Sequence, residues 1–343
     1  MRVFCKTIMM AFAVLSPPVA AAGLPDPLFQ DDATLKVMIT APLSTLLRAR
    51  PEQPELAGVF SYKEADGTSV DLDMQIRARG NFRKRICDFP PLNLNFRKSQ
   101  VEGTLLEHQN KLKVVAHCKD SLRYEQAVLR EYLAYRILNS LTDLSFRVRL
   151  LQVTYVDSDE RRPRMVRSAF LIEHRNRLAD RIGGESLEIE RTEVSAIRPD
   201  HLNLTSMFQF LIGNTDFSPN LGSNNECCHN HEMFADDAGA LLAIPYDFDL
   251  AGFVNAPYAA PDPELGIDSV RQRLYRGYCV NNSRVEATVD RFLEARSTLY
   301  ALVADQQELE PTVREYIASY MDEFYEVIGD PREVERQIIG KCI

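Results

Sequence analysis

The sequence has no excess of basic residues. Its 343 residues include 49 Asp and Glu against 40 Lys and Arg, which gives a formal net charge of −9 at pH 7. Proteins that bind nucleic acids or membrane surfaces mainly through charge need a basic face. We therefore expect no nucleic-acid partner. The composition, 45% hydrophobic and 26% charged, is typical of a globular protein, and at about 150 residues per domain the length suggests two domains or one two-lobed unit.

Several familiar catalytic motifs are also missing. The sequence contains no His-Glu-x-x-His motif, no Gly-x-Ser-x-Gly motif, no Walker A loop and no glycine-rich dinucleotide motif. These absences argue against zinc proteases, α/β-hydrolases, P-loop enzymes and Rossmann dehydrogenases. No internal repeat or low-complexity run is present.

No apolar run is long enough to cross a membrane, which takes about 20 residues. The longest N-terminal apolar stretch, residues 8–15, follows Arg2 and Lys6 and precedes the small residues Ala20 to Ala22. A charged start, a short apolar core and an Ala-x-Ala site are typical of a secretory signal peptide. We expect residues 1–22 to be removed after Ala22 and the mature protein to be periplasmic or secreted, with no membrane span.

Cleavage would remove Cys5 and leave six of the seven cysteines. An even number of cysteines in an exported protein indicates disulfides, although six cysteines allow about 15 connectivities. We favour a Cys87–Cys118 pair because both residues lie in the N-terminal half. The run Cys227-Cys228-His229-Asn230-His231 offers only one half of a zinc site, so disulfide or loop roles suit it better.

The first half of the chain has mostly strand patterns and the second half mostly helical patterns. Apolar and polar residues alternate over 70–79, which is the period of a half-buried strand, and 121–141 carries a helical apolar stripe. We expect an α+β protein with the boundary near residues 175–195. Further strands are expected at 35–40, 92–96, 111–116, 149–156, 165–173 and 241–244, and further helices at 202–212 and after 285.

The most informative stretch runs from residue 211 to residue 252. A helix ends at Gly213, Asp216 follows in a loop, and after Asn230 a hairpin delivers Asp247 and Asp249. Phosphoryl transfer from ATP needs Mg²⁺ held by carboxylate and amide oxygens, and a further carboxylate near the attacking hydroxyl. Protein kinases supply these groups in the same order, as a loop Asp, an Asn, a hairpin and a second Asp.

This order assigns a role to each residue. Asp216 would be the catalytic carboxylate, Asn230 and Asp247 would bind the metal, and Asp249 would be a second ligand or its support. Oxygen donors of this kind suit Mg²⁺ or Mn²⁺. The 14-residue step from Asp216 to Asn230 is longer than in protein kinases, so Asn220 remains the rival amide ligand.

The first half of the chain supplies candidate phosphate contacts. Arg79, Gly80 and Asn81 open a locally basic segment that continues through Arg83, Lys84 and Arg85. A glycine turn lets backbone approach a phosphate, and the arginine fork matches its oxygens. We also expect a strand lysine, Lys113, to pair with a glutamate of the following helix, Glu131. Lys111 and Glu125 are the alternatives, because Lys111 and Lys113 share one strand face.

At this point the sequence resembles the CotH family of spore-coat kinase-like proteins. The resemblance covers roughly residues 70–255 and rests on the segments Arg79-Gly80-Asn81, Gly213-Asn214-Thr215-Asp216, Pro245-Tyr246-Asp247-Phe248-Asp249 and Ala251-Gly252, and on the strand around Lys113 that leads into a helix. It implies a bilobal protein-kinase-like fold, ATP and divalent-metal binding, and phosphorylation of exported proteins. Asp216 matches the catalytic Asp of the family and Asp247 its metal-binding Asp.

Together these observations predict an exported atypical kinase. The expected fold has an antiparallel β-rich N-lobe over 23–180 and a mostly helical C-lobe over 181–343. ATP with Mg²⁺ or Mn²⁺ would bind between the lobes, and the acceptor would be a hydroxyl of an exported protein. The alternatives are a non-catalytic nucleotide- or protein-binding scaffold and a metal-dependent hydrolase that uses the same carboxylates.

Overall fold

The computed structural model describes residues 23, 25–49, 54–220 and 227–343. The expected signal peptide, residues 1–22, lies outside the described residues. In the described part, seven strands form a closed barrel in the order β1-β2-β3-β4-β5-β7-β6. The barrel strands are β1 (Leu35–Ala41), β2 (Leu56–Lys63), β3 (Ser69–Ala78), β4 (Leu92–Phe96), β5 (Lys111–Val115), β6 (Val148–Asp157) and β7 (Met165–Ile172).

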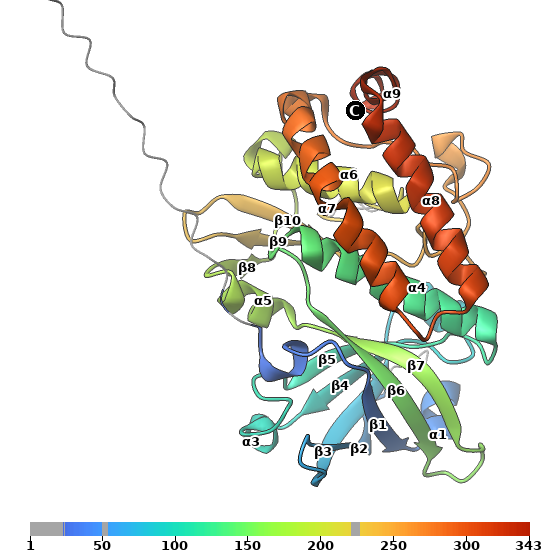
Figure 1. Ribbon diagram of the computed structural model, residues 1–343. Coiled ribbons are helices and arrows are strands. Elements are labelled where there is room, and N and C mark those ends of the chain that lie inside the picture. The colour runs from blue at the N-terminus through green and yellow to red at the C-terminus, as the bar shows by residue number, and fades with distance from the viewer. Residues whose placement is uncertain (1–22, 24, 50–53, 221–226) are drawn as a thin grey trace, which may run out of the picture.

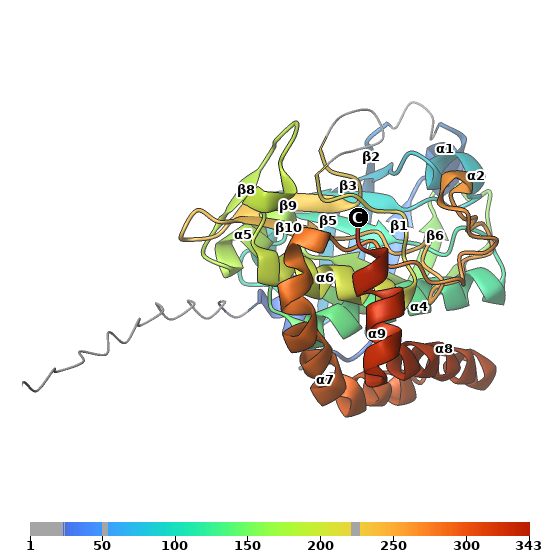
Figure 2. The ribbon, with the colours of Figure 1, turned by 90° about the horizontal axis from the view of Figure 1, so that it is seen from above.

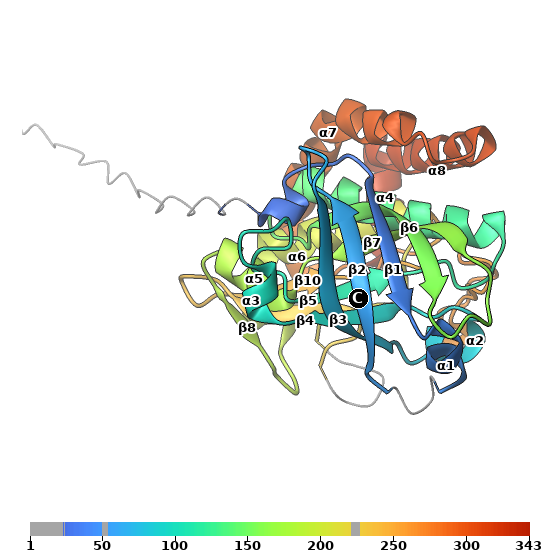
Figure 3. The same cartoon turned by 90° about the horizontal axis from the view of Figure 1, so that it is seen from below.

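The alternating sequence of β3 explains how the barrel is filled. Leu72, Met74 and Ile76 are buried while the Asp and Gln residues between them are exposed, so one face of the strand points inward. The inward residues of the other strands join the same core, which contains Phe60, Phe96 and other apolar side chains. Figure 3 shows these strands from below, with α1 (Leu43–Arg48) and α2 (Arg83–Ile86) at one end.

The expected bilobal kinase-like fold is wrong. The barrel is mixed, because β1 pairs parallel to β6 from Leu35 opposite Leu151 to Ala41 opposite Asp157, while the other neighbouring strands are antiparallel. That pairing joins segments more than one hundred residues apart, and strand periodicity says nothing about such partners. The strand β2 was also not expected. The helix after β5, α4 (Leu122–Leu141), packs on β6 and β7 of the barrel, and the C-terminal helices stack on α4, above the barrel in Figure 1 and seen from above in Figure 2.

Helix α4 (Leu122–Leu141) connects the barrel to the C-terminal helices. Its tyrosine Tyr135 contacts Phe170 of β7 and Phe248 with tilted rings, whose centroids are 5.6 and 4.6 Å apart. A single apolar core extends from there through the C-terminal helices. The remaining helices are α3 (Lys98–Val101), α5 (Arg175–Arg181), α6 (Pro199–Ile212), α7 (Val285–Asp305), α8 (Pro311–Gly329) and α9 (Pro331–Gln337), with 3₁₀ turns at Pro27–Phe29, Val194–Ala196, Pro263–Leu265, Cys279–Arg284 and Ile339–Lys341.

A small antiparallel sheet lies beside the helices in the second half of the chain. It has the order β10-β9-β8, with β8 (Glu185–Leu187), β9 (His231–Ala235) and β10 (Leu241–Pro245). Helix α6 precedes this hairpin and ends at Gly213, which has the left-handed φ of 62° expected for a C-cap glycine. A side chain at Gly213 would overlap the hydroxyl of Tyr320, so both the turn and the packing require glycine there.

Three disulfides join the six cysteines of the described residues. The expected Cys87–Cys118 pair is present, with Cα atoms 4.5 Å apart. The others are Cys227–Cys228 and Cys279–Cys342. Such pairing is compatible with an exported protein. No helix in the described ranges combines the length and the apolar character needed to cross a bilayer.

Candidate functional site

The candidate site forms where three parts of the chain meet: the segment after β3, helix α4 and the end of the β9–β10 hairpin. Arg83 of α2 marks this meeting point. Its Nη1 lies 3.2 Å from Oε2 of Glu131, its Nε lies 3.2 Å from Oδ2 of Asp249, and its Nη2 forms an ion pair with Asp247. The side chain is only 7% exposed. One buried guanidinium therefore holds three acidic groups from α4 and from the end of the hairpin.

The expected pairing of Lys113 with Glu131 is wrong. The Nζ atom of Lys113 lies 3.6 Å from Oε1 of Glu232 on β9, and 5.2 Å from the ring centroid of Tyr246. Glu131 is already paired with Arg83. Because Arg83 comes from a four-residue helix after β3, nothing in strand or helix periodicity could assign it to Glu131.

The alternative residues for this pair, Lys111 and Glu125, do not form it either. Glu125 accepts a hydrogen bond from the backbone N–H of Ser168 at 2.6 Å, away from Lys113. Lys111 and Lys113 line one cavity, as their shared strand face predicts. Burial and the charge of Arg79 lower the pKa of Lys113, while Glu232 and Asp247 oppose that shift. Lys113 is therefore the lysine whose charge interacts with the carboxylates of the site.

The long step from Asp216 to Asn230 is closed by backbone pairing. Ser218 forms an antiparallel bridge with His229, and its N–H donates to the carbonyl of His229 at 3.0 Å. As a result the Asn230 side-chain amide donates to Oδ2 of Asp216 at 2.9 Å, and Nε2 of His229 lies 2.7 Å from Oδ1 of Asp216. The structure therefore brings Asp216 and Asn230 together.

The rival Asn220 has different partners. Its Oδ1 accepts hydrogen bonds from the hydroxyls of Ser218 and Tyr278, each at 3.2 Å. Asn230 is 9% exposed and adjoins Asp216 directly. The geometry therefore favours Asn230 over Asn220 as the amide of the site.

Asn230 and Asp247 both have left-handed backbone, with φ of 53° and 61°. Non-glycine residues adopt this conformation uncommonly, although Asn and Asp do so more readily than others. Two contacts hold these positions: the hydroxyl of Tyr135 accepts from the N–H of Asp247 at 2.8 Å, and the carbonyl of Asn230 accepts from the N–H of Tyr246 at 3.0 Å. Such conformations are concentrated at functional sites.

The buried carboxyls of the site differ in how readily they ionise. Burial raises the pKa of Glu131 to about 8, although Arg83 opposes the shift. Burial also raises the pKa of Asp249 to about 6. Burial acts in the same direction on Asp247, but Arg83 and Arg79 outweigh it, and the pKa of Asp247 is lowered. Asp247 is therefore the permanent negative charge of the group.

The charge of the loop residue Asp216 also acts on the ionisable side chains of the site. A hydrogen bond that the His229 imidazolium donates to the carboxylate of Asp216 raises the pKa of His229, and the charge of Asp247 adds to that shift. The charge of Asp216 likewise contributes to the raised pKa of Asp249. The charges of Asp216 and Asp247 thus act on the same two neighbours, His229 and Asp249.

The oxygen atoms left over at the site suit a hard divalent cation. Among the described residues, no hydrogen bond uses Oδ2 of Asp247, Oδ1 of Asp249 or Oδ1 of Asn230. At the same site, Oε1 of Glu131 is buried and has no hydrogen-bond partner among the described residues. No set of three or more His, Cys, Asp and Glu side chains in the described ranges forms a metal site by itself. A cation bound here would have to take further ligands from phosphate and water.

The three residues expected to bind phosphate lie on the β3 side of the site. Gly80 and Asn81 are exposed, and Gly80 has a φ of 87° with open space around its Cα. The guanidinium of Arg79 has its pKa lowered by burial, against the opposing charge of Asp247. The arrangement puts Arg79 near Asp247 and leaves the Gly80–Asn81 backbone accessible.

Sequence reasoning missed several residues that build the site. Arg83 was part of the basic run, but its role as the partner of three carboxyls was not predicted. The hydroxyl of Tyr258 donates to Oδ2 of Asp249 at 3.0 Å, and Glu232 pairs with Lys113. No periodicity points to Arg83, because Arg79 follows the end of β3 and Arg83 begins the four-residue helix α2.

Comparison of the sequence with models of known protein families and with curated proteins gives no match.

Proposed function

We propose that the protein transfers the terminal phosphate of ATP to a hydroxyl group of an exported protein, as the resemblance to the CotH family implies. The observation that carries this proposal is the grouping of Asp216, Asn230 and Asp247 from distant segments around a set of cations. Phosphoryl transfer depends mainly on positioning and on charge stabilisation. Acidic groups for a metal and basic groups for phosphate oxygens are the parts that such a reaction uses.

Each side chain has a defined task in this proposal. Asp216, held by Asn230 and His229, orients the acceptor hydroxyl and accepts its proton. A new bond forms between the acceptor oxygen and the γ-phosphorus, and the bond from that phosphorus to the β,γ-bridging oxygen breaks. Arg79 and Lys113 bind phosphate oxygens and offset their charge.

The free oxygens of Asp247, Asp249 and Asn230 would hold Mg²⁺ or Mn²⁺. When bound, the cation neutralises charge that develops on the phosphate oxygens. Arg83 keeps Asp247 and Asp249 in place while leaving one oxygen of each carboxylate for this purpose.

A non-catalytic scaffold that binds a nucleotide or a protein is the second candidate. The observation in its favour is Arg83 itself, because its guanidinium already supplies positive charge to Asp247 and Asp249. In a scaffold this ion pair would replace the metal. The two candidates differ in whether labelled phosphate reaches an acceptor.

The test measures ATP binding and phosphate transfer with the same purified protein. Thermal unfolding with ATP, with and without Mg²⁺ or Mn²⁺, reports binding, and γ-labelled ATP with dephosphorylated casein or the protein itself reports transfer. We expect Asp247→Asn to abolish the metal-dependent stabilisation and Asp216→Asn to keep it. Both substitutions should reduce transfer by about a hundredfold or more.

Asp237→Asn is the matched control, because Asp237 is an exposed residue at the tip of the same hairpin. It should leave both measurements unchanged. Binding without transfer by the unmodified protein would establish the scaffold, and metal-dependent stabilisation that survives Asp247→Asn would refute the metal assignment.

A further inference from the structure

A cavity of about 870 Å³ lies at the α1–α2 end of the barrel, outside the candidate site. Its floor contains aromatic rings: Phe89 stacks on His117 with centroids 4.9 Å apart and contacts Tyr155 at 4.6 Å. The disulfide Cys87–Cys118 joins the two segments that supply Phe89 and His117. The cavity is therefore built on a fixed base.

Arginine dominates the walls of this cavity. Five of its lining residues are arginines, which come from α1, from the β6–β7 turn and from β7: Arg48, Arg161, Arg162, Arg164 and Arg167. Only Arg167 pairs with a carboxylate within the described residues, that of Asp120. Asp88 is the other acidic lining residue. In a chain with a net charge of −9, a group of unpaired arginines is a distinct positive surface.

The acidic residues of the β6–β7 turn form no ion pair with these arginines within the described residues. Asp157 accepts hydrogen bonds from the N–H and hydroxyl of Ser44, and Asp159 accepts from the N–H of Thr45. Both carboxylates are thus occupied by the first turn of α1, and the guanidinium groups of Arg161 and Arg162 remain exposed.

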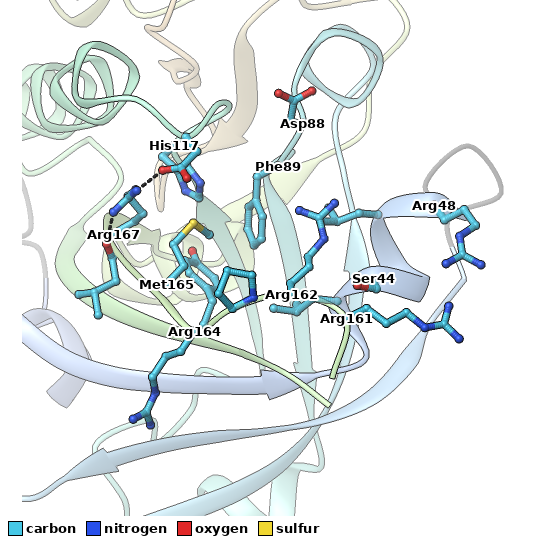
Figure 4. Close-up of a pocket in the computed structure, with 16 residues that line it drawn as sticks. Ser44, Arg48, Asp88, Phe89, His117, Arg161, Arg162, Arg164, Met165 and Arg167 are labelled. Atoms are coloured by element: carbon cyan, nitrogen blue, oxygen red, sulfur yellow. Dashed lines mark hydrogen bonds and ion pairs between the residues drawn. The ribbon is translucent and has the colours of Figure 1, made fainter. Parts of the chain in front are cut away.

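The arginines spread around the cavity and do not converge on one point. Figure 4 shows Arg48 and Arg161 on one side of Phe89, Arg164 and Arg167 on the other, and Arg162 between them. A compact anion such as a polyphosphate would contact a few of these groups at once. A flexible chain with carboxylates along its length can reach groups on both sides.

Two polar atoms of the floor also lack partners. Nδ1 of His117 and the hydroxyl of Tyr155 are buried with no hydrogen bond to any described residue. Buried polar groups are normally satisfied, and exceptions call for an explanation. Both atoms are enclosed by the protein, so a ligand in the cavity would not reach them unless the floor rearranged.

We propose that this arginine-rimmed cavity binds an acidic segment of a partner protein, with carboxylates on the arginine rim and the peptide backbone over the aromatic floor. The binding does not depend on phosphoryl transfer, and it occurs at the end of the barrel that carries α2. A partner held there would lie on the side of the molecule from which Arg83 enters the candidate site.

The experiment measures direct binding of fluorescent decapeptides to the full-length mature protein. The probes are a Glu- and Asp-rich peptide, a peptide in which those residues are Gln and Asn, and inorganic tripolyphosphate as a competitor. We expect binding of the acidic peptide only, with affinity that falls as salt rises. The double substitution Arg161→Glu with Arg162→Glu should weaken binding by about tenfold or more.

The matched control is Arg97→Glu with Lys98→Glu. These residues are also an adjacent exposed basic pair, but they lie at α3, on the opposite end of the barrel. The control changes the net charge by the same amount and should leave the affinity within about twofold. No binding of the acidic peptide, or an equal loss in both double variants, would overturn the proposal. Tripolyphosphate that displaces the peptide at lower concentration than the peptide binds would overturn it as well.

Discussion

Arg83 is the residue on which the candidate site depends most. It is buried, and it pairs with carboxyl groups from two distant parts of the chain. Removing one partner of a buried ion pair leaves an uncompensated charge, which is far more costly than losing a surface pair. The site is therefore an electrostatic group in which each member depends on the others.

The raised pKa of Glu131 predicts a specific pH dependence of stability. Burial raises this pKa from 4.5 to about 8, so between these values the folded state holds a proton that the unfolded state has released. The free energy of unfolding therefore falls as the pH rises through this window. Thermal unfolding from about pH 5 to about pH 8 should show this loss, and Glu131→Gln should reduce it.

The control for this experiment is Glu294→Gln, which changes an exposed glutamate of α7. Its pH profile should follow that of the unmodified protein. Identical profiles for Glu131→Gln and the unmodified protein would show that Glu131 stays ionised in the folded state.

At the scale of single residues, the sequence suggested which carboxylate and amide side chains belong to the site, but not that Arg83 is the cation that pairs with its carboxylates. Asp216, Asn230 and Asp247 could be proposed because their order along the chain suggests a chemistry. The partner of Glu131 could not, because Arg83 reaches it through the arrangement of α2, which has only four residues. A helix of that length carries no periodicity that predicts its orientation.

Among the elements, the segment that contains α2 depends on a disulfide. Cys87 follows α2 directly, and Cys118 comes just before α4, so the bond fixes the helix that carries Arg83 next to the helix that carries Glu131. Short helices of one turn have little stability of their own. We therefore attribute the position of α2 largely to this covalent connection.

Replacing both Cys87 and Cys118 by Ser should lower the free energy of unfolding by about 2–4 kcal/mol, as is usual for a disulfide. It should also reduce phosphate transfer or metal-dependent ATP binding, because Arg83 is then less well positioned. Denaturant unfolding and the assays of the proposed function measure the two effects. Replacing Cys279 and Cys342 by Ser is the comparison. That bond closes a loop of 63 residues, so its loss should lower the free energy of unfolding at least as much. It should leave ATP binding and phosphate transfer intact. Equal functional loss in both variants would contradict this account of α2.

The elements with strong periodicity were predicted well. The alternation over 70–79 corresponds to β3, and the helical stripe over 121–141 corresponds to α4, which spans Leu122–Leu141. The strand β2 was missed, because its sequence includes a glycine at Gly58 and its burial alternates only weakly. A Cβ at position 58 would lie only 2.8 Å from the carbonyl oxygen of Thr40. This close approach of the two strands explains why a glycine stands there, although it weakens the strand pattern.

At the scale of the whole molecule, the side of β6 and β7 that faces α4 shares one apolar core with the C-terminal helices, while the barrel interior has a core of its own. Phe170 of β7 contacts both Tyr132 and Tyr135 of that helix. Because the parts are joined by buried side chains, we expect a single cooperative unfolding transition of the described part of the chain. Far-UV circular dichroism and tyrosine fluorescence should give coincident denaturation curves.

Phe170→Ala should shift both curves together by about 3–5 kcal/mol, because it removes a buried ring from the shared core. Val166→Ala, on the exposed part of the same strand, should change stability by no more than about 0.5 kcal/mol. Two separated transitions, or a shift in only one of the two probes, would show that the barrel and the helices unfold independently.

The overall architecture was the least predictable feature. The sequence indicates mostly strands before residue 175 and mostly helices afterwards, which suggested two lobes. The pairing of β1 with β6, which closes the barrel, depends on contacts between residues 35–41 and 151–157. Partners at that separation leave no trace in local periodicity, so the closed barrel could be recognised only in three dimensions.

The closing pair β1–β6 also determines when the barrel can close during synthesis. Among the described strands β1 is made first, but one of its two neighbours is not synthesised until more than one hundred residues later. Until then the early strands form an open ribbon with a free edge, which closes only when the distant segment arrives. A chain that emerges amino terminus first from a ribosome or a translocation pore would therefore keep its barrel open until β6 has also emerged.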